Sequence, residues 1–597
     1  MLEGLNSHQI DAVLSKRNTL VIACPGSGKT RVLTRKIAYE LENLESKKKY
    51  VVALTFTNRA AEEIQKRLDE MGISQEQLWA GTIHSFCYQW IIQPYSVYEP
   101  NLVHGFSIID ENKKNMILNQ LKEKNSLPYN VNINTSFDRK GHYLNEDRYK
   151  NEIASEFHQS ILQNKEIDFD LILYYSNRLL ENYPKIRFHL ANLFGYIFVD
   201  EYQDTQDLQY AIIGQIIKES CNDCKLFLVG DPDQAIYESL GGIAKTPYEI
   251  QGDTGNEEIV VKELPGNYRS SQRVIDFFRN FQSTDVNIKA LGANSEKAGI
   301  ITLDTVTDKN NLPNEFAKII TQNIESGVKP NEICIIAPQW YFLTPLAKKL
   351  KSLLPNVPFD APGLTPLPRN KENLWWRLSR LFLTEITPET SLNRFRWIRQ
   401  IIEQINTYTN GTLGFEHKDC RKYLRLINSI KPRETEGVRY LEIAFKSFFE
   451  ALEIDLNIHP VLNDQLYAFF KSINKRYESK EFDGIPSDVN YFKSVFSADK
   501  GIVINTCHGV KGEEFETVIA FGLLWGYVPH WSSIINKPKY EAQSASKKML
   551  YVIGSRAKTN LHLFAEQGRT TINGFPYRIN ENLAEVSFKY DNEFLTK

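Results

Sequence analysis

The residues best suited to chemistry form a glycine-rich octapeptide, Ala23-Cys24-Pro25-Gly26-Ser27-Gly28-Lys29-Thr30, which follows the apolar run Leu20-Val21-Ile22. A helix-compatible stretch begins directly after it, at Arg31. Strand, loop and helix in this order cradle a triphosphate, because the loop N–H groups and the positive helix end face the phosphates. In such a cradle Lys29 reaches the β and γ oxygens and the Thr30 hydroxyl ligates Mg²⁺. Residues 23–31 are therefore predicted nucleotide contacts.

A phosphate cradle needs a metal-binding acid on a neighbouring strand. Val199-Asp200-Glu201 supplies one at the end of a predicted strand, where Asp200 can hold Mg²⁺ and Glu201 can act as the general base toward water. A third strand ends in Gly230-Asp231-Pro232-Asp233-Gln234, which makes Gln234 a candidate sensor of the γ-phosphate. These positions predict a hydrolytic nucleotide site.

Phosphoryl transfer also needs positive charge on the transferring group. Two arginines are candidates: Arg269 in Asn267-Tyr268-Arg269-Ser270, and Arg556 in Gly554-Ser555-Arg556-Ala557. Considered alone, an arginine in either position is more often a residue of an ordinary surface ion pair.

The elements around these residues alternate between strand and helix. Short apolar strands are predicted at 20–22, 50–54, 196–199, 225–229, 333–337, 502–505, 517–520 and 561–564, and an amphipathic helix at 59–70. Two stretches lack clear strands and read as helical, from about 88 to 185 and from about 374 to 495. A proline-rich loop with Pro355, Pro358, Pro362, Pro366 and Pro368 precedes the second. The pattern predicts two α/β cores, each interrupted by a helical insertion.

Composition excludes several classes of protein. The 597 residues are 42% hydrophobic and 24% charged, with a formal net charge of −2, so nucleic acid would have to bind in a local channel rather than a uniformly basic surface. No apolar run is long enough to span a membrane, and no signal peptide is expected. Seven scattered cysteines fit a reducing cytoplasm. The pair Cys221 and Cys224 lacks the second pair that a zinc ribbon needs, so it is expected to be two reduced thiols.

Taken together, these stretches resemble the UvrD/Rep branch of superfamily 1 DNA helicases. Further blocks carry the resemblance in the family's order: Leu5 to Gln9, Leu54 to Ala61, Gly81 to Phe86, Thr506 to Phe515, and Tyr551 to Ala557. The resemblance implies that Gln9 contacts adenine, Tyr268 stacks on it, and Glu514 touches the ribose. It makes Arg269 and Arg556 arginine fingers, and ATP and Mg²⁺ the cofactors.

The same resemblance implies an α/β fold of two RecA-like P-loop NTPase domains with parallel sheets, each carrying a helical insertion. Residues 1–88 and 187–262 are expected to form core 1 around insertion 89–186. Residues 263–385 and 496–597 are expected to form core 2, with both arginine fingers, around insertion 386–495. ATP would lie between the cores, so that closing and opening of the cleft would move the grip on a strand.

A nucleic-acid track is implied on both cores. Thr55, Phe56, Thr57, Asn58 and His84 would contact DNA from the first core, and Thr506 and His508 from the second. A Phe56 that serves only the hydrophobic core is the alternative. The expected partner is single-stranded DNA or tailed double-stranded DNA, with 3′-to-5′ translocation and a location in the bacterial cytoplasm, associated with the nucleoid. Neither a membrane nor a metal beyond Mg²⁺ is expected.

Three departures from the family pattern bear on strand separation. Glu238-Ser239-Leu240-Gly241-Gly242 replaces a stretch that normally carries a base-stacking aromatic, and stacking contributes about 1–3 kcal/mol per base. Ala545, Ser546, Lys547 and Lys548 replace an acidic pair and two arginines. The insertions are also shorter than is usual, so duplex contacts cannot be transferred to them.

Two rival functions stay open from the residues alone. One is a nucleotide- and DNA-gated switch for a partner nuclease subunit, as in phage defence, with little unwinding of its own. The other is a motor directed at RNA. The main hypothesis is an ATP-dependent DNA helicase or translocase.

Overall fold

The computed structural model describes residues 2–44, 46–221, 223–238, 241–255, 258–361, 364–368, 373–409, 411, 413–479, 482, 484–496, 501–535 and 537–595. Ser239, Leu240 and Pro362, which enter the expectations above, lie outside the described residues. The chain forms two compact units. Met1–Ile275 and Phe281–Glu296 make the first, and Asp276–Asn280 and Lys297–Lys597 make the second.

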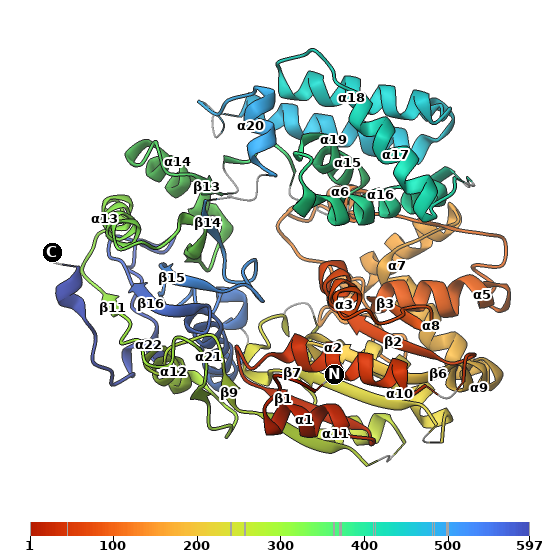
Figure 1. Ribbon diagram of the computed structural model, residues 1–597, viewed down its shortest axis with the longest axis horizontal. Helices are drawn as coiled ribbons and strands as arrows, with labels where there is room; N and C mark the ends of the chain where they lie inside the picture. The colour runs from red at the N-terminus through yellow and green to blue at the C-terminus, as the bar shows by residue number, and fades with distance from the viewer. Residues whose placement is uncertain are drawn as a thin grey trace. The chain divides into compact units, whose positions relative to one another are not determined.

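The first unit is organised by a parallel six-stranded sheet with the strand order β3-β2-β6-β7-β1-β8 (Figure 1). The strands are β1 (Thr19–Ala23), β2 (Tyr50–Thr55), β3 (Leu78–Thr82), β6 (Phe194–Asp200), β7 (Lys225–Gly230) and β8 (Val260–Leu264). Parallel strands carry helices on both faces, so they are buried on both sides. The carboxyl ends of β1, β6 and β7 therefore meet at one edge of the sheet, where the predicted site residues follow.

Alternate residues of each strand enter different cores. Along β7, Leu226 and Leu228 join one cluster while Phe227 and Val229 join the other. The second cluster packs against α1 (Ser7–Leu14), α2 (Lys29–Glu42) and α3 (Asn58–Glu70). The first packs against helices that include α8 (Phe169–Asn182), α9 (Pro184–Leu193) and α10 (Asp207–Glu219). Because successive side chains of a strand point to opposite faces of the sheet, each strand contributes to both cores, and each helix packs on the face whose core it shares.

The segment between β3 and β6 is mainly helical, as expected. It contains α4 (Ile83–Phe86), the π-helix η1 (Cys87–Ile92), α5 (Gln93–Tyr95), η2 (Ser96–Tyr98), α6 (Glu111–Lys124) and α7 (Arg148–Gln163) before α8, with two short parallel strands, β4 (Ser107–Ile108) and β5 (Glu166–Ile167). Its buried residues belong to the same cluster as one face of the sheet. The insertion and that face therefore share a continuous core.

Several short elements complete the first unit. They are η3 (Tyr202–Asp204), η4 (Pro232–Gln234), α11 (Pro247–Asp253), β9 (Gly266–Asn267) and β10 (Lys289–Ala290). Helix α12 (Gln272–Phe278) carries the chain from the first unit to the second, and η6 (Arg279–Phe281) brings it back.

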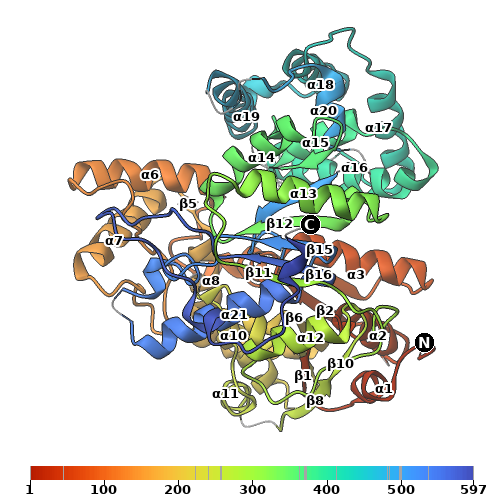
Figure 2. The ribbon, with the colours of Figure 1, turned by 90° about the vertical axis from the view of Figure 1, so that its left-hand side faces the viewer.

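The second unit also contains a parallel six-stranded sheet, with the order β11-β16-β15-β12-β14-β13. Its strands are β11 (Ile301–Asp304), β12 (Ile333–Ala337), β13 (Phe359–Asp360), β14 (Ile502–Thr506), β15 (Phe515–Ala520) and β16 (Ala557–Phe564). Figure 2 shows α13 (Leu312–Glu325) and α14 (Leu343–Leu353) on one side of it and α21 (Lys539–Gly554) on the other. Smaller elements are η7 (Pro330–Glu332), η8 (Trp340–Phe342), η12 (Trp531–Ser533), α22 (Glu581–Ala584) and η13 (Asn592–Phe594).

A helical segment interrupts this second sheet between β13 and β14. It consists of α15 (Leu374–Leu383), α16 (Pro388–Thr409), α17 (His417–Ser429), α18 (Gly437–Ala451), η10 (Leu456–Ile458), α19 (Pro460–Glu478) and α20 (Val489–Ser494). These helices share a core of their own, centred on Trp375, Phe445 and Phe449, that is distinct from the core beside the sheet.

The α/β class with two parallel sheets is confirmed. The predicted strands recur, most of them lengthened by one to four residues. In the two large sheets β3, β8, β11 and β13 were not expected, nor were the short strands β4, β5, β9 and β10. The division into units differs from the expected domains. Residues 263–275 and 281–296 group with the first unit rather than the second. Helix α15 shares the core of the helical segment although it precedes residue 386. Among the described residues, no helix is long and apolar enough to cross a membrane.

The separate core of the helical segment gives a test of its stability. Trp375 is fully buried, and its ring lies 5.4 Å from Phe445 and 5.2 Å from Phe449. Trp375→Ala should destabilise this segment by about 3–5 kcal/mol, because it leaves a large cavity. Hydrogen exchange should then quicken in 374–494 and stay unchanged in β1, β6 and β7. Trp340→Ala is the matched control, since Trp340 is 49% exposed. Equal losses in the two variants would contradict a separate core.

Candidate nucleotide and nucleic-acid site

The glycine-rich loop connects the end of β1 to the start of α2. Gly26 and Gly28 have φ angles of 68° and 80°, a region that glycine adopts without strain. Gly28 caps α2 without a side chain, which leaves the first N–H groups of the helix directed toward the loop. The Ser27 hydroxyl is buried and has no hydrogen-bond partner among the described residues. A buried donor of this kind fits a phosphate oxygen.

Asn267 fixes the shape of this loop from the side. Its amide nitrogen donates to the Pro25 carbonyl at 2.7 Å, and its amide oxygen accepts from the N–H groups of Arg269 and Ser270, each at 2.8 Å. The Tyr268 N–H donates to the Gly26 carbonyl at 2.8 Å. A Cβ on Gly26 would lie 2.7 Å from the Arg269 Cβ. The segment 267–270 and the loop therefore fit together only with glycine at position 26, and Arg269 lies beside the phosphate cradle within the first unit.

Gln9 and Tyr268 lie near the same loop. The Gln9 side chain is buried, donates to the Ser27 carbonyl at 2.9 Å and accepts from the Asn6 N–H at 3.0 Å. The Tyr268 ring is 41% exposed, and its hydroxyl accepts a hydrogen bond from the Asn6 side chain at 2.7 Å. Gln9 thus braces the loop, and its adenine contact stays a prediction, as does stacking by Tyr268.

The predicted acids meet Lys29 where β6 ends. The Lys29 ammonium lies 3.4 Å from a Glu201 carboxylate oxygen. Glu201 has a φ of 52°, a left-handed conformation that costs a non-glycine residue about 1–3 kcal/mol and is concentrated at functional sites. Asp200 ends β6 and is buried. Lys29, Asp200 and Glu201 are therefore brought together as the sequence predicts.

Buried carboxylates crowd this edge of the sheet. Burial, reinforced by the charge of Glu201, raises the pKa of Asp200 well above its ordinary value, while Lys29 opposes the shift. Burial also raises the pKa of Asp231 to about 7, again against Lys29. Gln234 donates to Asp231 at 2.7 Å, which holds the predicted sensor in the same cluster. Several carboxylates whose ionisation is disfavoured by burial suit a site that receives a divalent cation.

Gly230 makes room for Gln203 in this cluster. A Cβ on Gly230 would lie 2.1 Å from the Gln203 amide oxygen. Because the position has no side chain, the Gln203 amide can accept from the Asp231 N–H at 3.0 Å and donate to Glu201 at 2.6 Å. Gln203 thereby links the ends of β6 and β7.

Arg556 and Glu514 belong to the second unit. The Arg556 side chain is almost fully buried and donates to the carbonyls of Val552 and Glu513, each at 3.2 Å, and to the Ser555 hydroxyl at 2.9 Å. Lys558 lies 3.8 Å from the Glu514 carboxylate. The role of Arg556 as a finger requires its guanidinium to exchange these internal partners for a phosphate, and it stays a prediction.

Predicted nucleic-acid contacts in the first unit line one cavity of about 230 Å³. Thr55, Phe56 and His84 share its wall with Asp200 and Glu201. The Thr55 hydroxyl donates to the Thr57 carbonyl at 2.9 Å, and the Thr57 hydroxyl caps α3 ahead of Asn58. The cavity thus joins residues expected to bind DNA to residues expected to hydrolyse ATP.

Phe56 forms an aromatic pair that the sequence does not predict. Its ring is 43% exposed and stacks on Tyr237 at 4.9 Å between centroids. Phe56 is therefore not simply a core residue. His84 is part-buried and lies edge-on to Phe169 at 5.6 Å, and its burial lowers the pKa of the imidazole despite Asp170 and Asp168. His84 is consequently neutral near pH 7 and can accept a hydrogen bond.

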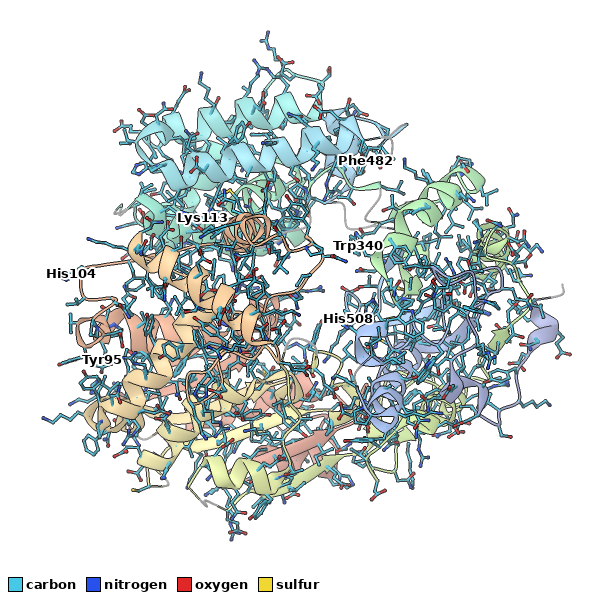
Figure 3. The ribbon with its side chains drawn as sticks, turned by 180° about the vertical axis from the view of Figure 1, so that it is seen from behind. Tyr95, His104, Lys113, Trp340, Phe482 and His508 are labelled. Carbon is cyan, nitrogen blue, oxygen red and sulfur yellow. The ribbon has the colours of Figure 1, made fainter. Side chains whose placement is uncertain are left out.

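Thr506 and His508 follow β14 in the second unit. The Thr506 hydroxyl accepts from the Gly509 N–H at 3.1 Å, and the Cys507 N–H donates to Ala337 at the end of β12 at 3.1 Å. The exposed Trp340 follows β12 and lies on the same side of this unit as His508 (Figure 3). The ends of β12 and β14 thus place an exposed aromatic and a polar turn on one side of this unit.

Comparison with known proteins bears on this arrangement. Residues 5–251 match the family described as UvrD/REP helicase N-terminal domain. The "Probable DNA helicase II homolog" of Mycoplasma capricolum is 26% identical over 95% of this chain and 85% of its own length. The "ATP-dependent DNA helicase PcrA" proteins of Bacillus subtilis and Staphylococcus aureus are each 25% identical, over 96% and 94% of this chain and 84% and 83% of their own lengths.

Over most of its length the chain is similar to UvrD/Rep-type DNA helicases. The family match spans the glycine-rich loop, the acids at the end of β6 and the Gln234 segment, and it ends before Asn267. The full-length similarity covers both units and both helical segments.

Several residues of this UvrD/Rep-like site escaped the sequence analysis. Asn267 stood in its motif without a role, and no role was predicted for Gln203 or for a pairing of Tyr237 with Phe56. The polar residues could have been found from their position directly after strands that end at the site. The Tyr237 pairing depends on the turn after η4, which sequence does not specify.

The raised pKa of Asp231 predicts a pH dependence of stability. Its folded pKa of about 7 exceeds the unfolded value of about 3.9, so the folded state binds more protons between these limits. Stability of the nucleotide-free protein should therefore fall, through this group, as pH rises from about 4 to about 7. Asp231→Asn should remove that component. Urea unfolding at several pH values measures it, and an identical pH slope in wild type and variant would contradict the assignment.

Proposed function

We propose that the protein is an ATP-dependent DNA helicase that moves 3′-to-5′ on single-stranded DNA. The observation that carries this proposal is the shared cavity, in which Asp200 and Glu201 line the same wall as Phe56 and His84. The names of the relatives, which are DNA helicases, support the same activity.

The residues present fit ATP and Mg²⁺. The loop N–H groups, the unpaired Ser27 hydroxyl and Lys29 suit the phosphates, while Thr30 and Asp200 are the candidate ligands of the cation. Bound Mg²⁺ would neutralise charge on the phosphate oxygens and so favour transfer of the γ-phosphoryl group. The high pKa values of Asp200 and Asp231 support this assignment, because a cation would compensate the charges that burial disfavours.

The chain's own residues divide the hydrolytic work. Glu201 accepts the proton of the attacking water, and Lys29, which pairs with Glu201 before substrate arrives, shifts its charge to the phosphates. Gln234, held by Asp231, senses the γ-phosphate. Arg269 adds positive charge from beside Gly26, and Arg556 adds it from the second unit after leaving its internal carbonyls.

Nucleic acid binds through stacking and polar contacts. The Phe56–Tyr237 pair offers an exposed aromatic face to a base, while Thr55, Thr57, Asn58 and neutral His84 contact the strand. Thr506 and His508, on the same side of the second unit as Trp340, supply contacts there. Because the cavity joins Phe56 to Glu201, a base at Phe56 changes the surroundings of the catalytic carboxylate, which gives a route for DNA to stimulate hydrolysis.

Removal of the loop lysine tests the catalytic assignment. Lys29→Ala should lower DNA-stimulated ATP hydrolysis by at least about a hundredfold, because the main positive charge on the phosphates is lost. Circular dichroism should show an unchanged fold. Lys262→Ala is the matched control, since Lys262 pairs with Asp11 at 2.7 Å on the edge strand β8. Turnover at the wild-type rate in Lys29→Ala would overturn the proposal.

Loss of the exposed ring tests the nucleic-acid assignment. Phe56→Ala should weaken single-strand binding about 5- to 100-fold, as expected for a base–aromatic contact of about 1–3 kcal/mol. Fluorescence anisotropy with a labelled oligonucleotide measures it, and Phe188→Ala, at an exposed position on α9, is the control. Unchanged affinity in Phe56→Ala would exclude this contact.

Strand displacement decides between motor and switch. Substrates with a 3′ or a 5′ single-stranded tail should show unwinding from the 3′ tail alone, and DNA should stimulate ATPase activity more than RNA of the same length. Slow hydrolysis without DNA dependence, and no displaced strand, would instead favour a nucleotide-gated switch that acts through a partner subunit.

A further inference from the structure

A buried carboxylate outside the catalytic set is bound by four donors. Asp233 lies in η4 between Asp231 and Gln234 and is 1% exposed. It accepts from the Ser283 N–H at 2.7 Å, the Thr284 hydroxyl at 2.7 Å, the Thr284 N–H at 3.3 Å and the Ser283 hydroxyl. Two consecutive residues, fifty positions further along the chain, thus satisfy both oxygens of one buried anion.

Ser283 and Thr284 occupy a special place in the chain. Residues Asp276–Asn280 group with the second unit, and the chain returns to the first unit at Phe281. The two residues come directly after this return. Asp233 therefore anchors the chain to the first unit right after one of the crossings between the units.

The other end of this anchor leads to the nucleotide site through consecutive hydrogen bonds. The Asp233 N–H donates to the Asp231 carboxylate at 3.1 Å, and Gln234 donates to the other oxygen of that carboxylate at 2.7 Å. The Asp231 N–H donates to Gln203, and Gln203 donates to Glu201, which pairs with Lys29. All of these interactions lie within the first unit, and each involves at least one buried or part-buried group.

We propose that Asp233, Ser283 and Thr284 are positioning residues that couple the state of the nucleotide site to the segment joining the two units. The inference rests on the proposed function, since it names how hydrolysis is transmitted. When substrate binds, Lys29 and Glu201 part and contact the substrate instead of each other. The Gln203 amide and the Asp231 carboxylate then lose or gain hydrogen-bond partners. Asp233 transfers that change to residues 283 and 284, because four hydrogen bonds leave this anion little freedom to absorb it.

Variants of the anchor separate coupling from catalysis. Asp233→Asn replaces one acceptor oxygen by a donor that faces the donors of Ser283 and Thr284, and Thr284→Val removes one hydroxyl at constant shape. ATPase activity without DNA, and the KM for ATP, should stay within about twofold of wild type. The stimulation of kcat by single-stranded DNA should fall about fivefold or more in Asp233→Asn, within the usual range of coupling between sites. The double variant should fall no further than Asp233→Asn, because both changes break one interaction.

A matched control excludes a general loss of structure. Asp138 accepts two backbone N–H groups at 2.8 Å, from Lys140 and His142, in the helical insertion. Asp138→Asn should lower the melting temperature by as much as Thr284→Val and leave DNA stimulation unchanged. A fall of basal and stimulated rates in equal proportion in Asp233→Asn would assign Asp233 a structural role and overturn the inference.

A second readout does not need DNA. A non-hydrolysable ATP analogue should change hydrogen exchange at residues 276–286 in wild type and leave it unchanged in Asp233→Asn, while both bind the analogue. An equal response in the two proteins would overturn the inference. A wild-type protein whose ATPase ignores DNA would overturn the proposed function, and the exchange experiment would still decide the coupling.

Discussion

Buried negative charge at the carboxyl ends of β6 and β7 is the constraint on which the site depends. Asp200 at the end of β6, and Asp231 and Asp233 just after β7, are all buried. Asp233 accepts four hydrogen bonds, Asp231 accepts from Gln234 and the Asp233 N–H, and Asp200 accepts from the Glu201 N–H. Burial raises the pKa of both Asp200 and Asp231 in spite of Lys29, so a cation bound there would relieve part of the cost of burying them.

The loop and the segment 267–270 form a second, purely geometric constraint. The Asn267 side chain donates to the Pro25 carbonyl of the loop, and the closeness of Arg269 and Asn267 leaves position 26 no room for a side chain. The phosphate cradle is therefore preformed by contacts within one unit. Hydrolysis that depends on Arg556 requires a further rearrangement, because that guanidinium is satisfied by carbonyl groups of its own unit. In this fold the phosphate-binding loop is thus shaped within the first unit alone, whereas a catalytic role of Arg556 would need a rearrangement in the second.

The sequence predicts the parts of this site that depend on short-range patterns. Short apolar runs locate β1, β6 and β7. The residues at or after the ends of these strands converge as the parallel topology demands; they are Lys29, Asp200, Glu201 and Gln234. Partners set by tertiary packing were not predictable. The pairing of Phe56 with Tyr237 and of Asp233 with Ser283 joins residues far apart in the chain, and no local periodicity encodes it. The grouping of residues 263–275 with the first unit follows from the same cause, since Asn267 attaches them to Pro25.

The missing side chain at Gly230 has a consequence for how this chain can change over time. Even a methyl group there would collide with the Gln203 amide, although the φ angle is ordinary and glycine is not needed for the backbone. Position 230 therefore has no room for a side chain, although the residue itself performs no chemistry. The same methyl group would also lie 2.6 Å from the Tyr202 ring, so a larger residue at 230 would require changes at both 202 and 203.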